Sequence, residues 1–268
     1  MDTTPAQLLR NRMREKLARD EPVIAMIVRL VRGIEIAQIA ATAGFDALYV
    51  DMEHSGLSFD GTGQICMAAQ AMGVTPLVRV PAISADYVAR VLDLGALGVI
   101  APQIRSAGEA RQLVDAAKFP PLGHRSYSSS MPQFGFRSVP PAESNPVLDA
   151  ATLVVPMIET VDALDQVEEI ASVDGVDMLL VGPNDLSAEL GTPGDFDNPR
   201  LHDAFRRVIE ACRSRGKHAG IGGLGASRTD LVARFVELGA RYISVGSDIG
   251  FLTAACIEKA RQVRTALP

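Results

Sequence analysis

Two carboxylates stand at the ends of apolar runs that are too hydrophobic to lie in water. Glu159 follows LVVPMI, and Asp185 lies just beyond MLLVG. Two carboxylates on adjacent strand ends repel each other, which raises one pKa unless a cation neutralises them. A hard divalent ion, with its other positions filled by water and substrate, would do so. The structural alternative makes Asp185 the N-cap of a helix that begins at Leu186, and Glu159 a charge before a helix that begins at Val161.

A histidine and an arginine occupy similar positions. Asp51, Glu53 and His54 lie in DMEHSG, directly after another apolar run, where a histidine can act as a general base near neutral pH. Arg79 ends an apolar run within PLVRVP, so its guanidinium must face an anion. That anion is a substrate carboxylate or enolate oxygen or, as the structural alternative, Asp51 or Glu53.

These residues need a scaffold that brings strand ends together. From residue 23 onward, short β-branched runs alternate with amphipathic helical patterns. We predict eight strands, over residues 23–28, 47–51, 76–80, 98–102, 152–159, 177–182, 218–222 and 242–246. We predict helices over residues 35–43, 59–72, 85–94, 107–118, 161–172, 199–215, 228–238 and 251–265.

Strands this apolar are buried on both faces, which, with alternating helices, indicates a parallel sheet. Eight such units predict one α/β domain over residues 1–268, a closed (β/α)8 TIM barrel whose chemistry lies at the carboxyl ends of its strands. The alternative is an open doubly wound sheet with a nucleotide cofactor. Its glycine-rich loop is missing, because VRLVRGIE after the first strand contains one glycine.

Two segments fall outside this repeat. Residues 1–20, with a helix over 5–18, are predicted to cap the amino-terminal end of the barrel. The connection over 119–149 is rich in Pro, Ser, Gly and Phe and is much longer than a usual loop. It is a candidate lid, substrate loop or subunit contact, with a mobile excursion as the alternative. Because it begins on the face away from the chemistry, it must wrap around the barrel to reach a ligand.

The composition narrows the possible classes of function. The chain has 268 residues, of which 47% are hydrophobic, and a net charge of −6 with a pI near 5.3, so no nucleic-acid surface is expected. Its apolar runs are too short for a membrane span, and its first residues lack the apolar stretch of a signal peptide. We therefore predict a cytoplasmic protein without a membrane partner. Cys66, Cys212 and Cys256 are predicted to be small buried side chains.

The positions of the lysines bear on the reaction type. Imine chemistry needs a lysine at the carboxyl end of a barrel strand. Lys16, Lys118 and Lys259 lie in helical patterns, and Lys217 precedes the seventh strand at the closed end. No Schiff-base lysine is therefore expected, and a metal ion must withdraw electrons instead.

The residues above resemble the HpcH/HpaI aldolases, metal-dependent pyruvate aldolases of the phosphoenolpyruvate/pyruvate barrel superfamily. The resemblance is carried by DMEH, VRVP, LDLGALGVIAPQIRSAGEARQLVDAAKFPPLGHRS, and IET with GPNDLS, and it covers about residues 20–260 in order. It implies that Glu159 and Asp185 bind Mg²⁺, Mn²⁺ or Co²⁺. It also implies that His54 is the base, that Asp93 is the carboxylate supporting it, and that Arg79 stabilises enolate and carboxylate charge.

The resemblance has three further implications. The main chain around Pro183 and Asn184 would hold the carboxylate of a 2-oxo acid. Family members are typically hexamers built from dimers that exchange their last helix, so Asp93 would act across an interface in a homo-oligomer. Many members carry Gln two residues before the metal-binding Glu, where this chain has Met157. Met157 shares a strand face with Glu159, and its thioether cannot donate a hydrogen bond, which changes how substrate is oriented.

The function expected from these residues is that of a class II pyruvate aldolase, a lyase. His54 would take the proton from the hydroxyl of a 4-hydroxy-2-oxo acid, and the C3–C4 bond would break. Protonation of the enolate then gives pyruvate, with an aldehyde such as succinate semialdehyde or tartronate semialdehyde as the second product.

Three other functions stay open at this point. A malyl- or citramalyl-CoA lyase, or a citrate-synthase-like enzyme, would need basic residues for CoA, and the long connection offers Arg125 and Arg137. A phosphate-binding isomerase would use the glycines in 222–223 and 246–247. A non-catalytic protein would bind metal and pyruvate without exchanging the methyl protons of pyruvate.

Overall fold

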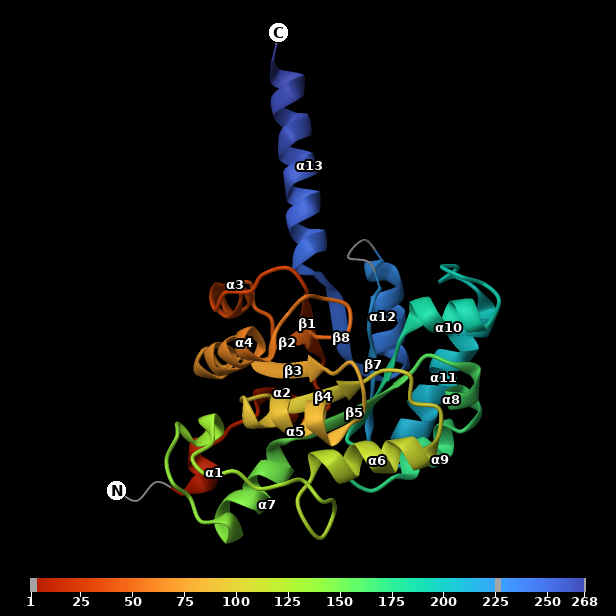
Figure 1. Ribbon diagram of the computed structural model, residues 1–268. Helices are drawn as coiled ribbons and strands as arrows, with labels where there is room; N and C mark the ends of the chain where they lie inside the picture. The colour runs from red at the N-terminus through yellow and green to blue at the C-terminus, as the bar shows by residue number, and fades with distance from the viewer. Residues whose placement is uncertain (1–3, 225–227, 268) are drawn as a thin grey trace.

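Eight parallel strands close into a barrel that helices surround (Figure 1). The computed structural model describes residues 4–224 and 228–267, so residues 1–3 of the predicted amino-terminal segment lie outside the described residues. Each strand pairs with the next in chain order, and the last returns to the first. The TIM-barrel prediction is confirmed. The strands are β1 (Val23–Val28), β2 (Ala47–Asp51), β3 (Thr75–Arg79), β4 (Gly98–Ala101), β5 (Leu153–Ile158), β6 (Met178–Val181), β7 (His218–Ile221) and β8 (Ala240–Ser247).

The predicted helices are present with ends shifted by at most three residues, and all but the last cover the outside of the barrel. One prediction is wrong in detail: the helix expected over 161–172 is divided at Gln166, where φ is −107° and ψ is 19°. The helices that match the prediction are α3 (Glu35–Thr42), α4 (Phe59–Ala71), α5 (Ala85–Asp93), α6 (Ala107–Ala117), α8 (Val161–Asp165), α9 (Val167–Ser172), α11 (Pro199–Ser214), α12 (Thr229–Leu238) and α13 (Asp248–Ala266).

Side chains of each strand alternate between the barrel interior and the surrounding helices. On β2, Ala47 and Tyr49 pack inside the barrel with Tyr242, whereas Leu48 and Val50 pack in the cluster that includes the helices. Both faces of such a strand are buried, which explains why the sequence shows continuous apolar runs rather than an alternating pattern.

The amino-terminal end of the barrel is capped by two short helices, not by the single helix predicted over 5–18. They are α1 (Pro5–Leu8) and α2 (Arg12–Leu17). The chain leaves the helical conformation at Asn11, because its side chain caps α2 and also donates to the backbone oxygen of Ala151 at 2.8 Å. Met13 of α2 packs into the interior cluster, so the predicted capping role is confirmed.

The connection over 119–149 is not a loop throughout. It contains a 3₁₀ turn (Pro132–Phe134) and most of α7 (Pro141–Ala151). The sequence pattern missed α7 because of its prolines: Pro141 stands at the first position, where proline is tolerated, but Pro146 lies inside the helix. Phe134 packs in one cluster with Leu9 of the amino-terminal segment, and Figure 1 shows α1 beside α7. The connection therefore covers the amino-terminal side of the barrel, away from the carboxyl ends of the strands.

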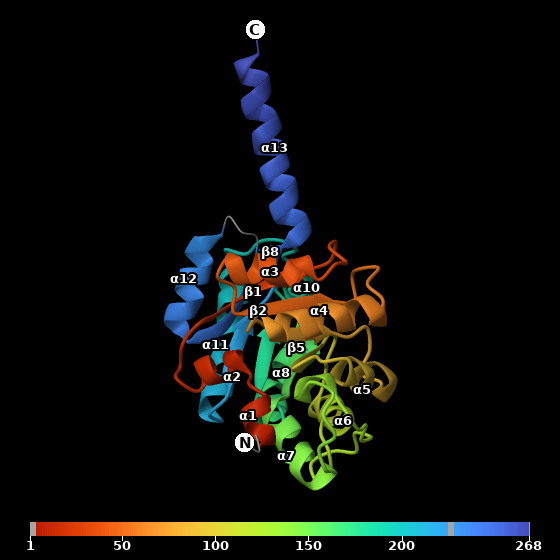
Figure 2. The ribbon, with the colours of Figure 1, turned by 90° about the vertical axis from the view of Figure 1, so that its left-hand side faces the viewer.

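The last helix, α13, projects away from the barrel (Figures 1 and 2). Its side chains find few partners within the chain, and Ile257 is 64% exposed. For the same reason Cys256, which lies on this helix, is exposed. The prediction of buried cysteines is therefore wrong for Cys256, whereas Cys66 and Cys212 are buried as predicted.

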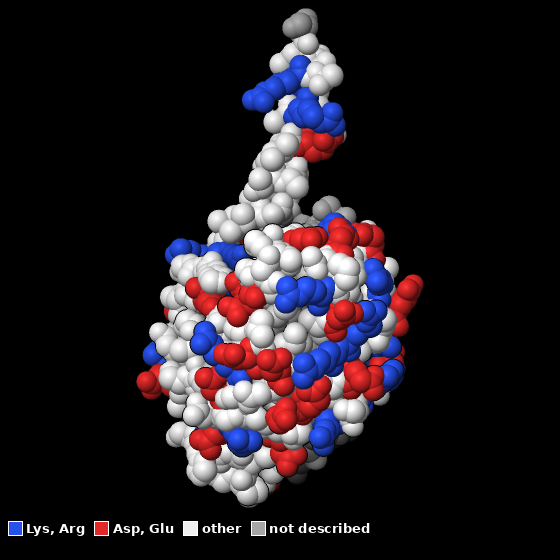
Figure 3. Space-filling model, turned by 90° about the vertical axis from the view of Figure 1, so that its right-hand side faces the viewer, with Lys and Arg blue, Asp and Glu red and all other residues white. Residues whose placement is uncertain are grey.

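Acidic and basic side chains are interspersed over the face of the barrel that Figure 3 displays. The part of α13 nearest the barrel has an uncharged surface, because residues 249–257 contain no charged side chain. Among the described residues, none of the helices combines the length and the apolar character needed to cross a membrane.

Candidate active site

A cavity of about 270 Å³ opens at the carboxyl ends of the barrel strands. Most of the predicted site residues line it, and Asp51 and Glu53 contact Arg79 from outside the lining. The predicted residues in its wall are His54, Arg79, Met157, Glu159, Pro183, Asn184 and Asp185. The other lining residues are Ile27, Arg29, Tyr49, Gly182, Gly222 and Gly223.

Glu159 is a carboxylate that the protein has withdrawn from water. Its exposure is 1%, and Oε1 accepts hydrogen bonds from the backbone N–H (2.6 Å) and the side-chain amide (3.1 Å) of Gln103. Oε2 is buried and has no hydrogen-bond donor among the described residues. Burial raises the pKa of Glu159 to about 7; the hydrogen bonds from Gln103 oppose this shift, and the negative charges of Asp185 and Glu53 add to it.

The second predicted ligand, Asp185, lies in the first turn of α10 (Pro183–Glu189). This helix begins directly after β6, with Gly182 as its N-cap. The structural alternative, which made Asp185 the N-cap of a later helix, is therefore wrong, because proline at the first position starts the helix earlier. A Cβ at Gly182 would lie 2.7 Å from Oε2 of Glu159, so any larger residue at this position would clash with the carboxylate.

The donor set fits a hard cation whose coordination is completed by non-protein ligands. One buried oxygen, Oε2 of Glu159, has no hydrogen-bond donor among the described residues, and Asp185 is exposed at the cavity. Carboxylate oxygens are the ligands that Mg²⁺ and Mn²⁺ prefer. Within residues 4–224 and 228–267, no three His, Cys, Asp or Glu side chains form a complete metal-binding group. Water and substrate would therefore supply the remaining ligands.

A fully buried carboxylate, Asp51, holds two arginines at the mouth of the barrel. It accepts hydrogen bonds from Nε and Nη2 of Arg79, at 2.9 and 2.6 Å, and from Nε of Arg29 at 2.6 Å. Burial acts to raise the pKa of Asp51, but the bonds and charge of Arg79 outweigh it and hold this pKa below its usual value. Nη1 of Arg79 lies 2.8 Å from Oε2 of Glu53. The ion pairs of the structural alternative are thus present, and Arg79 lines the cavity as well.

His54 and Asp93, predicted to act as a pair, lie apart in one chain. The His54 side chain is 56% exposed at the cavity, with Nε2 at 3.7 Å from Oε2 of Glu53, and its backbone N–H donates to Asp51. Asp93 ends α5, on the side where the next strand begins, and accepts a hydrogen bond from Nη2 of Arg125 at 2.7 Å. The supporting role of Asp93 stays a prediction, and it requires a second subunit.

Met157 gives part of the cavity an apolar wall. It is 4% exposed, and the hydroxyl of Tyr49 donates to its sulfur at 3.8 Å. Asn184 is exposed and donates through Nδ2 to the backbone oxygen of Gly223 at 3.4 Å, and Pro183 is buried. The surface beside Glu159 that Met157 provides therefore offers a substrate no amide donor.

Comparison with known proteins agrees with this arrangement. The sequence profile of the HpcH/HpaI aldolase/citrate lyase family matches residues 32–255. The chain belongs to this family. It is 41% identical to a 4-hydroxy-4-methyl-2-oxoglutarate aldolase of Hapsidospora irregularis over 89% of both chains. It is 38% identical to another of that name from Chaetomium globosum, over 94% of this chain and 95% of the other.

A solved structure supports the same conclusion. The crystal structure of an HpcH/HpaI aldolase from Desulfitobacterium hafniense matches with a TM-score of 0.88 at 30% identity, over 95% of this chain and 97% of the other. This member of the HpcH/HpaI family is therefore an aldolase, as the sequence predicted.

Three residues of the HpcH/HpaI site were not among the predicted ones. Gln103 follows β4, and its φ of +55° turns its backbone N–H toward Glu159. Arg29 follows β1, and Tyr49 lies inside β2. A search for polar side chains after every strand would have found Gln103 and Arg29, because both stand where barrel enzymes place their chemistry.

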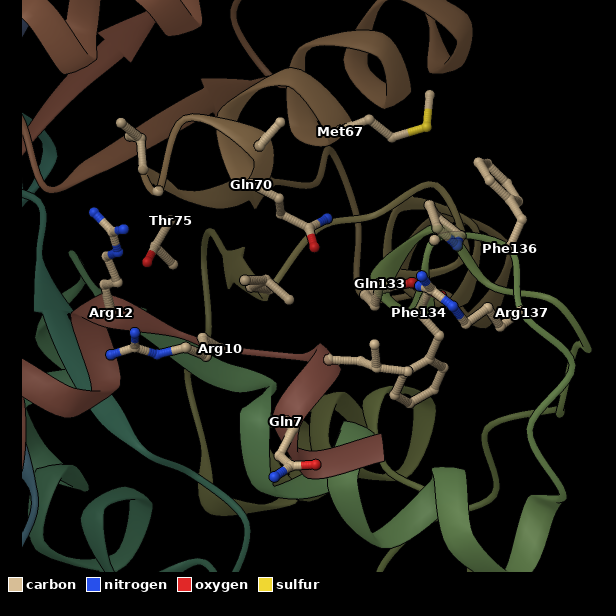
Figure 4. Close-up of a pocket in the computed structure, with 17 residues that line it drawn as sticks. Gln7, Arg10, Arg12, Met67, Gln70, Thr75, Gln133, Phe134, Phe136 and Arg137 are labelled. Carbon is tan, nitrogen blue, oxygen red and sulfur yellow. The ribbon is translucent and has the colours of Figure 1, made fainter. Parts of the chain in front are cut away.

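A second cavity, of about 460 Å³, is lined in part by the amino-terminal helices (Figure 4). Figure 4 shows Arg10 and Arg12 at one side of it, Arg137 at the other and Gln70 between them. None of the predicted site residues lines this cavity, and its described lining holds no carboxylate. Within the connection, residues 132–137 line this cavity, and none of residues 119–149 lines the one at the mouth. In a single chain the connection therefore packs under the barrel, and its role as a lid, substrate loop or subunit contact stays a prediction.

Removing the charge of Glu159 should stabilise the metal-free protein. A glutamate ionises near pH 4.5 when unperturbed, whereas Glu159 ionises near pH 7 in the fold, so its ionisation lowers stability as pH rises between these values. The difference corresponds to at most about 3 kcal/mol. Glu159→Gln keeps an oxygen for Gln103, and should raise the melting temperature in chelator at pH 8 but not at pH 4.5.

The control is Glu169→Gln, which removes an exposed carboxylate from α9 and should change the melting temperature little at either pH. An equal gain from Glu159→Gln at both pH values would contradict the cost of a buried charge.

Proposed function

We propose that this aldolase uses a divalent cation to cleave 4-hydroxy-2-oxo acids between C3 and C4, releasing pyruvate and a second carbonyl compound. The observation that carries the proposal is the buried Oε2 of Glu159, which has no hydrogen-bond donor among the described residues. The negative charge of Asp185 also raises the pKa of Glu159. Mg²⁺, Mn²⁺ or Co²⁺ held by Glu159 and Asp185 would withdraw electrons from the carbonyl group of the 2-oxo acid.

His54 is the residue that we assign to proton transfer. Its side chain lines the cavity and is more than half exposed, so it can approach the 4-hydroxyl group of a bound substrate. It removes the hydroxyl proton while the electrons of the C3–C4 bond move to C3, which leaves an enolate and turns C4 into a carbonyl carbon. A proton returned to C3 completes pyruvate. Such general-base help is worth about 10²–10⁴ in rate.

Arg79 and the start of α10 orient the 2-oxo acid. Arg79 keeps a fixed position because Asp51 and Glu53 hold it, and its guanidinium retains N–H groups beyond those that Asp51 accepts. These place positive charge beside the developing enolate oxygen. The main chain at Pro183 and Asn184, which line the same cavity, holds the carboxylate of the 2-oxo acid in this proposal.

The relatives favour a substrate with a carboxylate and a methyl group on C4. Both that we compare are named 4-hydroxy-4-methyl-2-oxoglutarate aldolases, and this compound splits into two molecules of pyruvate. We propose this class of substrate ahead of those that release succinate semialdehyde or tartronate semialdehyde.

The alternative functions fit the geometry less well. A CoA ester would need cations at the mouth, but the Arg125 side chain is fully buried on Asp93 and Arg137 lines the second cavity. A phosphate-binding isomerase would use Gly222 and Gly223, which do line the mouth, but it leaves the buried charge of Glu159 without a purpose.

Exchange of the methyl protons of pyruvate for deuterium tests enolate formation directly. With Mg²⁺, Mn²⁺ or Co²⁺ the protein should catalyse the exchange, and chelation should reduce it at least about 100-fold, because the metal supplies several kcal/mol. Proton NMR measures the rate. No exchange with any of the three metals would contradict pyruvate as the nucleophile, and full exchange after chelation would contradict the metal requirement.

Two substitutions should separate metal binding from proton transfer. Glu159→Ala removes a ligand, so the affinity for Mn²⁺ measured by calorimetry should fall at least about 100-fold, with loss of turnover. His54→Ala should keep that affinity within about threefold and slow cleavage by about 10²–10⁴. Equal Mn²⁺ affinity in the wild type and in Glu159→Ala would rule out Glu159 as a ligand.

We also propose that the enzyme is a homo-oligomer, a hexamer built from dimers in which α13 packs on another subunit. This helix leaves the barrel, and its uncharged stretch is exposed in the single chain. Light scattering should give several times the mass of one chain, and Ile257→Glu should reduce that mass. Ile24→Glu, at an exposed isoleucine of β1, is the control. A monomeric wild type would contradict this assembly.

A further inference from the structure

Arg29 presents unpaired N–H groups to the active-site cavity. Its side chain lines the cavity and is 33% exposed, and Nε donates to Asp51 at 2.6 Å. Nη1 and Nη2 have no acceptor among the described residues. The Arg79 side chain, in contrast, is 6% exposed, with Nε and Nη2 on Asp51 and Nη1 at 2.8 Å from Glu53. The protein thus engages all three nitrogens of Arg79 and leaves Nη1 and Nη2 of Arg29 for a ligand.

The backbone of Arg29, like its Nε atom, is held by a hydrogen bond to a buried carboxylate. The N–H groups of Arg29, Leu30 and Val31 donate to the carboxylate of Asp248, at 3.0, 2.9 and 2.8 Å. Asp248 is 6% exposed. A guanidinium fixed both through its backbone and through Asp51 loses little freedom when it binds an anion, which favours binding.

The barrel places Arg29 across the mouth from the proposed metal ligands. In a closed barrel of eight strands, β1 and β5 are four strands apart in either direction, and Arg29 follows β1 as Glu159 follows β5. A substrate whose 2-oxo acid end lies at Glu159 and Asp185 therefore extends its far end toward Arg29.

We propose that Arg29 binds the carboxylate on C4 of the substrate, so that the enzyme selects substrates whose second product is itself a 2-oxo acid. This inference rests on the proposed function. Nη1 and Nη2 of a guanidinium match the two oxygens of a carboxylate, and such paired, charge-assisted bonds are strong.

The reaction balances with Arg29 as a binding residue only. The hydroxyl proton passes to His54, the C3–C4 bond breaks, and the carboxylate stays on Arg29 as part of the departing ketone. In the reverse direction the same contact holds a second 2-oxo acid with its ketone carbon turned toward the enolate.

The test compares two substrates that differ only in this carboxylate. 4-Hydroxy-4-methyl-2-oxoglutarate carries it, and in 4-hydroxy-2-oxopentanoate a hydrogen replaces it. In the wild type kcat/KM should favour the first substrate, and in Arg29→Gln this preference should fall about 100-fold, because glutamine can still reach Asp51 but cannot pair with a carboxylate. Arg29→Lys should lose less, since it keeps the charge.

The control is Arg32→Gln, which removes the same charge from an exposed arginine beside Gly56, outside the cavity lining. It should leave the preference within about threefold. Equal loss of both substrates in Arg29→Gln would overturn the proposal and make Arg29 a support for Asp51. A wild type without preference for the first substrate would overturn it too.

Deuterium exchange of pyruvate by the wild type distinguishes failure of the carboxylate-binding role of Arg29 from failure of the proposed aldolase function. If exchange occurs while Arg29→Gln keeps the substrate preference, the carboxylate-binding role fails and the proposed function stands. If no exchange occurs with any of the three metals, the proposed function itself fails.

Discussion

Closure of the barrel brings the carboxyl ends of eight buried strands to one mouth, and charged side chains at those ends lose their water. Asp51 has no exposed surface, and Glu159 is 1% exposed. Burying an ionised carboxylate costs several kcal/mol unless a partner compensates the charge. The arrangement of the site follows from the different ways in which these two charges are compensated.

The protein compensates Asp51 itself. Two arginines and the backbone N–H groups of the following turn surround it, which fixes Arg79 and sets the turn that carries His54. Glu159 receives hydrogen bonds from Gln103 alone, and one of its oxygens is left without a donor. Asp51 therefore holds the arginines and the turn of the site in place, whereas the uncompensated charge of Glu159 supports the proposal that this side chain binds a cation.

The barrel was predictable because a strand buried on both faces appears in the sequence as a continuous apolar run. Eight such runs that alternate with helical patterns indicate a (β/α)8 barrel. The shared position of Glu159 and Asp185 at one cavity was predictable because both follow neighbouring apolar strands, whose carboxyl ends meet at the mouth of a barrel. The role of Asn11 was not predictable, because it depends on a hydrogen bond to the backbone oxygen of Ala151, which is far away in the sequence. The side-chain amide of Gln103 could have been found from its position after β4, whereas its backbone N–H bond to Glu159 could not, because every residue type except proline carries that group.

One aspartate connects the last helix to Arg29, which lines the active-site cavity. Asp248 begins α13, and it accepts the N–H groups of the three residues that follow β1, Arg29 among them. One buried carboxylate therefore joins the first turn of α13 to the backbone of Arg29. A subunit that packs on α13 would restrain Asp248 and, through three hydrogen bonds, the backbone of Arg29. The proposed assembly through α13 and the proposed carboxylate site at Arg29 would therefore be linked through Asp248.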